Sequence, residues 1–104
     1  MKSKRSKACD ISQAVKEKVW ERDHHHCINC GSPFAMPNAH YIARSHGGLG
    51  IEENIVTLCQ DCHNSFDNGK SKERKEHIKR NIEAYLSQLY PNWSIDSLIY
   101  KKRL

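Results

Sequence analysis

Two pairs of cysteines constrain the fold of this 104-residue chain more than any other feature of its sequence. The pairs are Cys27–Cys30 and Cys59–Cys62, each with two residues between its members, and 28 residues separate one pair from the other. Each short turn can direct two sulfurs at one ion, so the four thiolates match the tetrahedral ligand set of a structural zinc site. Two disulfides or buried free thiols are the alternatives. Cys9 lies outside both pairs and is expected to be a free thiol.

The composition favours zinc among these alternatives. Only 38% of the residues are hydrophobic, and the mean hydropathy is −0.80. A domain of this size builds a small core, which is marginally stable without a cross-link. The sequence has no apolar stretch of membrane-spanning length and no apolar leader after its basic start, so we expect a cytoplasmic protein with no membrane partner. In that compartment paired cysteines hold metal more often than they form disulfides.

The charge of the chain points to a polyanionic partner. Lysine and arginine number 17 against 12 acidic residues, which gives a formal net charge of +5. The excess gathers at residues 2–7, 70–80 and 101–103. Such a balance favours nucleic acid, although a solvated surface that keeps a small protein soluble gives the same composition.

The hydrophobic pattern predicts one small α+β domain over residues 10–90. Residues 1–9 are basic without apolar periodicity and predict a flexible arm. Residues 91–104 are expected to form a tail that packs on the domain. The expected helices cover residues 10–23, 60–68 and 71–90, the expected strands cover residues 39–43 and 55–58, and residues 31–38 are expected to form a loop.

Several residues predict where these elements begin and end. Asp10 or Ser12 can cap the first helix, and Gly69 is placed to follow the second as its C′ residue. Between the strands, three glycines predict a tight loop; they are Gly47, Gly48 and Gly50. The apolar face of the long helix is Ile78, Ile82, Tyr85, Leu86 and Leu89.

The residues between and just after the cysteine pairs add an ordered set of polar side chains. The order is His40, then the Gly47-Gly48 pair, then Asn54, then Cys59-x-x-Cys62-His63. This pattern resembles the HNH endonuclease family, and most closely the short HNH proteins of bacterial viruses and prophages. The resemblance covers roughly residues 20–69. It implies a ββα-metal core, in which a hairpin and a helix are braced by the structural zinc and surrounded by flanking helices.

The resemblance assigns a role to each of these residues. His40 takes the place of the general base, Asn54 that of the central asparagine, and His63 that of a metal ligand. An imidazole suits the base because its pKa lies near neutrality. Asn54 would hold the glycine-rich loop by side-chain hydrogen bonds to the backbone. Asp67 lies four residues after His63, so both side chains share a helix face and can hold one ion.

Three further positions qualify this assignment. Many family members carry a metal ligand immediately before the catalytic histidine, where this chain has Ala39. We therefore expect His63 and Asp67 to hold the metal together with waters and phosphate oxygens, the alternative being a weakened or lost activity. Arg44 is a candidate to clamp the scissile phosphate, or equally a surface arginine. The run of residues 24–26, all histidines, is expected to be a polar surface segment.

The sequence thus predicts a metal-dependent endonuclease that nicks or cleaves DNA with little sequence specificity. Its expected metals are one structural Zn²⁺ and a catalytic Mg²⁺ or Mn²⁺, with other divalent transition metals as further candidates. DNA is the expected partner, and phage packaging proteins follow by analogy with the family. A non-catalytic zinc-ribbon module that binds DNA is the alternative, and a zinc domain that binds proteins is a third hypothesis. The oligomeric state is left open.

Overall fold

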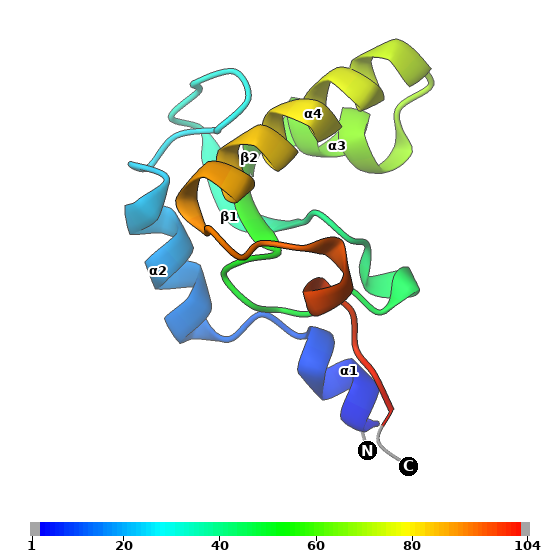
Figure 1. Ribbon diagram of the computed structural model, residues 1–104. Coiled ribbons are helices and arrows are strands. Elements are labelled where there is room, and N and C mark those ends of the chain that lie inside the picture. The colour runs from blue at the N-terminus through cyan, green and yellow to red at the C-terminus, as the bar shows by residue number, and fades with distance from the viewer. Residues whose placement is uncertain (1–2, 103–104) are drawn as a thin grey trace.

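The computed structural model describes residues 3–102 and confirms the small α+β class (Figure 1). A two-stranded antiparallel sheet lies at the centre, with helices around it. In chain order the elements are α1 (Lys4–Cys9), α2 (Gln13–Arg22), β1 (Ala35–His40), a 3₁₀ turn (Arg44–His46), β2 (Ile55–Cys59), α3 (Gln60–Asn68), α4 (Lys72–Leu89) and a second 3₁₀ turn (Ile95–Leu98). Within the described chain, no helix combines the length and the apolar character that crossing a bilayer requires.

Two of the predicted helices form much as their sequence pattern indicates. The hydroxyl of Ser12 accepts a hydrogen bond from the backbone N–H of Val15 at 3.1 Å, so Ser12 is the N-cap of α2. α4 buries Ile78, Ile82 and Leu86, which lie on the predicted face. All of β2 is buried, and the core joins it to α3 and α4. The core therefore lies between the sheet and these two helices.

The prediction of a flexible arm is wrong for residues 4–9, which form α1. Residues 1–2 lie outside the described part of the chain. The hydroxyl of Ser3 caps the helix, and the side chain of Cys9 is buried. The backbone N–H of Gly50 donates to the carbonyl of Ala8 at 3.0 Å. α1 is thus held by a residue 42 positions further along the chain, a contact that local sequence patterns do not encode.

The first strand begins earlier than predicted. β1 covers Ala35–His40, so the expected loop at 31–38 is partly strand, and residues 41–43 lie beyond the strand's end. The register pairs Ala35 with Cys59 and His40 with Ile55, with an irregularity between Met36 and Ala39. Pro37 lies in that irregularity, where its missing N–H removes no regular ladder bond. The loop was predicted because glycine, serine and two prolines fall within residues 31–38, and Pro37 is the one of these that lies in the strand.

Gly69 follows α3 as predicted but for a different reason. Its φ of −65° is not left-handed, so the αL geometry expected of a C′ glycine is absent. A Cβ at this position would overlap the carbonyl oxygen of Ser65. The glycine is required by close backbone approach.

The C-terminal segment packs against the loop between the strands. Leu98 is buried, and its carbonyl accepts a hydrogen bond from the N–H of Leu49 at 2.8 Å. The N–H of Tyr100 donates to the carbonyl of Gly47, also at 2.8 Å. Trp93 donates from its indole nitrogen to the carbonyl of Glu53. α1 and the C-terminal segment consequently meet on the same side of the molecule (Figure 1).

Candidate metal centre and catalytic cleft

The two cysteine pairs come together at one point. The four sulfurs of Cys27, Cys30, Cys59 and Cys62 all lie within 4.8 Å of one another. The first pair lies in the turn after α2, whereas Cys59 ends β2 and Cys62 lies in the first turn of α3. All five cysteines are free, which contradicts the disulfide alternative. This donor set has the ligand number and type of a structural zinc site, as predicted.

Backbone amides point at two of these four sulfurs. The N–H of Cys30 points to the sulfur of Cys27, and the N–H of Cys62 points to that of Cys59, at 3.5 and 3.4 Å. Burial raises the pKa of Cys27, but backbone hydrogen bonds outweigh burial and lower that pKa to about 7. Burial raises the pKa of Cys62 to about 12. A bound cation would keep a thiol with a raised pKa, such as that of Cys62, deprotonated.

Two asparagines that the sequence analysis did not single out support this cluster. Asn29 lies between the cysteines of the first pair, and its amide donates to the sulfur of Cys62 at 3.3 Å. Asn81, on α4, donates to the Oδ1 of Asn29 at 2.7 Å and so orients that amide. The placement of Asn29 within the first pair was the only signal in the sequence, and Asn81 had none.

His40 stands at the end of β1, half-buried, with one ring nitrogen already engaged. Its Nε2 lies 2.9 Å from the carbonyl oxygen of Cys9, at the end of α1. A carbonyl only accepts hydrogen bonds, so Nε2 carries the hydrogen and Nδ1 keeps its lone pair. Burial lowers the pKa of His40 below 6.5; the Cys9 bond opposes this shift and the charge of Arg44 adds to it. A lowered pKa favours the neutral form of the ring, which is the form a general base needs.

Asn54 makes the hydrogen bonds that were expected of it. The side chain is fully buried, and its Oδ1 accepts from the N–H of Ile42 at 2.8 Å. Its Nδ2 donates to the carbonyls of Leu49 and Ile42 at 2.8 and 3.2 Å. One amide therefore ties both ends of the loop that follows His40.

His63 and Asp67 lie on one face of α3 and in contact. The Nε2 of His63 is 2.9 Å from the Oδ2 of Asp67. Both line a hollow of about 320 Å³ whose walls also include His40 and Arg44. Four of the predicted site residues thus share one cleft, while Asn54 lies behind it in the core.

Among the described residues, no third metal-binding side chain forms a group with His63 and Asp67 to replace the ligand missing at Ala39. Ala39 itself is fully buried in the core. Within residues 3–102, the four cysteines are the only group of three or more metal-binding side chains. The pair of His63 and Asp67 therefore offers two protein ligands to an ion in the cleft.

Arg44 reaches the cleft but is also tied to the N-terminal segment. Its guanidinium lies 2.6 Å from the Oδ1 of Asp10 and donates to the carbonyl of Ser6 at 3.1 Å. The histidines at 24–26 are exposed, as expected. His25 stacks on Trp20, with ring centroids 4.8 Å apart, and neither residue lines the cleft.

Comparison with known proteins agrees with this geometry. The family described as HNH endonuclease matches residues 27–69, a segment that contains both cysteine pairs, His40, Asn54, His63 and Asp67. No curated protein matches the chain. α1, α2, α4 and the C-terminal segment lie outside the matched residues. Residues 27–69 of this chain are therefore similar to the HNH endonuclease family, and they contain a cluster of four cysteines that can hold a metal ion.

Proposed function

We propose that this protein is a metal-dependent endonuclease that hydrolyses phosphodiester bonds of DNA. One observation carries the proposal. His40, with Nε2 bonded to the Cys9 carbonyl, lines the same cleft as the His63–Asp67 pair. A neutral imidazole with a free Nδ1 beside two metal-binding side chains is the arrangement that phosphodiester hydrolysis requires.

In the proposed reaction His40 acts on water. Nδ1 accepts a proton while the water oxygen forms a bond to phosphorus, and the bond from phosphorus to the 3′-oxygen breaks. The departing oxygen takes its proton from solvent. The Cys9 carbonyl fixes the ring and stabilises the imidazolium that forms, because Nε2–H then donates to it more strongly. Asn54 acts indirectly, by holding the backbone that follows His40.

His63 and Asp67 would hold the catalytic ion. One imidazole and one carboxylate suit Mg²⁺ or Mn²⁺ as a partly hydrated site, and the imidazole also suits other divalent transition metals. When bound, this ion would stabilise the charge that develops on the phosphate and on the leaving oxygen. Arg44, on the same wall, supplies a second positive charge to that phosphate.

Little sequence specificity is expected of so small a surface. Two lysines of α4, Lys75 and Lys79, line a second hollow together with His40. Cations in this position bind phosphates whatever the base sequence, and this contact positions the duplex without reading it.

Plasmid nicking tests the proposal. The zinc-loaded protein is incubated with supercoiled plasmid and Mg²⁺, Mn²⁺ or Ni²⁺, and the wild type is compared with His40→Ala. We expect the substitution to lower the nicking rate by roughly 10²- to 10⁴-fold, with zinc content and thermal melting unchanged. A wild type that binds DNA but never nicks it with any of these ions would establish the non-catalytic zinc-ribbon alternative. Nicking by His40→Ala at the wild-type rate would remove the base assignment.

A further inference from the structure

We propose that α1 and the C-terminal segment form a basic groove that binds the phosphate backbone of the DNA flanking the cleft. The proposal deepens the proposed function and rests on it for the class of substrate. It assigns a role to two segments that lie outside the residues similar to the HNH family.

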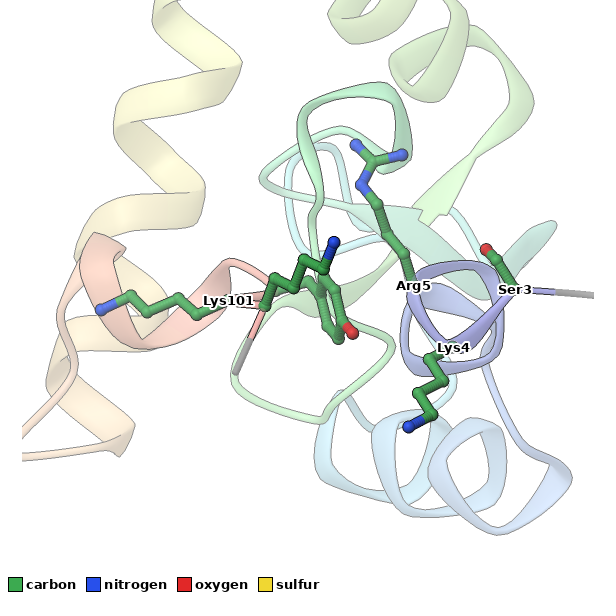
Figure 2. Close-up of a pocket in the computed structure, with 6 residues that line it drawn as sticks. Ser3, Lys4, Arg5 and Lys101 are labelled. Carbon is green, nitrogen blue, oxygen red and sulfur yellow. The ribbon is translucent and has the colours of Figure 1, made fainter. Parts of the chain in front are cut away.

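The groove runs between the start of α1 and the last described residues, and has a volume of about 820 Å³ (Figure 2). Its lining residues carry positive charges or hydroxyl groups and include no acid; they are Ser3, Lys4, Arg5, Tyr100, Lys101 and Lys102. Lysine, arginine, serine and tyrosine side chains all bind phosphate oxygens in protein–DNA complexes.

Two of these cations are already engaged by the protein. Lys101 extends toward the 3₁₀ turn at 95–98, where its Nζ lies 2.6 Å from the Oδ2 of Asp96 (Figure 2). Arg5 donates from Nη2 to the carbonyl of Ser45 at 3.1 Å. Lys4 and Lys102 are exposed, and neither forms an ion pair with an acid in the described part of the chain. These two lysines are the charges that the groove offers to a ligand.

The loop at 44–47 links the groove to the cleft. Ser45, whose carbonyl binds Arg5, itself lines the cleft beside His40 and Arg44. Tyr100, which lines the groove, donates from its N–H to the carbonyl of Gly47 in the same loop. A DNA strand that leaves the cleft across the loop at 44–47 therefore enters the groove.

The surface chemistry favours a nucleic acid over an anionic membrane. Surfaces that bind membranes insert apolar side chains beside their basic ones. The groove lining includes none of the exposed large apolar side chains of the described residues, which are Phe34, Met36, Leu89 and Ile95. A concave, hydroxyl-bearing groove that continues a cleft fits an extended polyanion.

DNA binding as a function of salt concentration tests the groove separately from catalysis. All binding variants carry His40→Ala, so that the duplex stays intact, and anisotropy of a labelled 20-base-pair duplex is followed between about 50 and 200 mM NaCl. Each lost phosphate contact lowers the slope of log affinity against log salt by about 0.9. We expect Lys4→Ala/Lys102→Ala to lower that slope by about 1.8. Arg5 is left in place because it holds Ser45.

The matched control is Lys16→Ala/Lys18→Ala on α2. It removes the same charge, and neither residue lines the groove or the cleft. Its slope should equal that of the parent. The proposal would be overturned if the slope decreased equally in both double variants, or if it did not decrease in the groove variant. Loss of binding to phosphatidylserine vesicles with DNA binding intact would overturn it in favour of a membrane. Nicking is assayed in the protein that retains His40, so the groove result stands even if the wild type never nicks DNA.

Discussion

The cysteine cluster and the catalytic cleft are built in opposite ways. The cluster needs only two short turns, each of which brings its own pair of sulfurs. The cleft needs α1, the end of β1, the loop after it and α3, which lie far apart in the chain. A metal site made of local turns is visible in residue spacing. The contact between the candidate base, His40, and a distant backbone carbonyl is visible only after folding.

Loss of a cysteine ligand should have the largest effect. Cys59→Ser removes one of four thiolates, and structural zinc in small domains contributes on the order of 10 kcal/mol to folding. We expect the variant to lose its zinc and its cooperative thermal transition, measured by metal analysis and circular dichroism. Cys9→Ala is the control, since Cys9 is buried but lies outside the cluster. Retention of one zinc and of the wild-type melting curve by Cys59→Ser would contradict the cluster's structural role.

Disruption of α1 should affect the cleft and spare the cluster. Proline in a helix interior removes a hydrogen bond and breaks the helix, so Ala8→Pro should displace the Cys9 carbonyl from His40. Misplacement of a catalytic group by about 1 Å can cost roughly 10²-fold in rate. We expect a loss of that order in nicking with one zinc still bound.

The ring of His40 gives a direct readout of the same variant. Nitrogen chemical shifts should report the Nε2–H tautomer in the wild type and in the control Ala8→Ser, and a mixture of tautomers in Ala8→Pro. An unchanged tautomer together with full activity would show that α1 does not orient the base.

The pH dependence of nicking should be the smallest of these effects. It should again distinguish the cleft, which nicking reports, from the cysteine cluster, which zinc content reports. Burial lowers the pKa of His40 from its ordinary value of 6.5. The ring is therefore neutral at any pH well above this lowered pKa. We expect a plateau near neutral pH and a decline, about tenfold per unit, only once the pH falls below that pKa. Zinc content is measured on the same samples. A decline that begins well above pH 6.5 would contradict the burial argument.

The sequence predicted the parts of this molecule that depend on neighbouring residues. Ser12, the apolar face of α4 and both cysteine pairs were recognisable because cap, periodicity and spacing are local signals. The order of His40, Asn54 and His63 was recognisable through the family resemblance. Each of these signals lies within a few residues or within one motif.

The errors have a common physical cause. α1 is a helix of six residues without apolar periodicity, and its partners are Ser45, Gly50 and His40. The predicted bounds of the first strand were wrong because Pro37 favours a loop unless a partner strand accommodates it. The contact of the Cys9 carbonyl with His40 could not be predicted, because every residue has a backbone carbonyl. The roles of His63, Asp67 and Arg44 in catalysis remain predictions.

Gly50 turns the docking of α1 into a steric requirement. A Cβ on this residue would overlap the carbonyl oxygen of Asp10 and approach that of Cys9 to 3.0 Å. Any larger side chain would push the loop away from the Cys9 carbonyl oxygen, which contacts His40. A side chain at position 50 would therefore displace the backbone of residues 9–10, and with it the carbonyl that contacts His40.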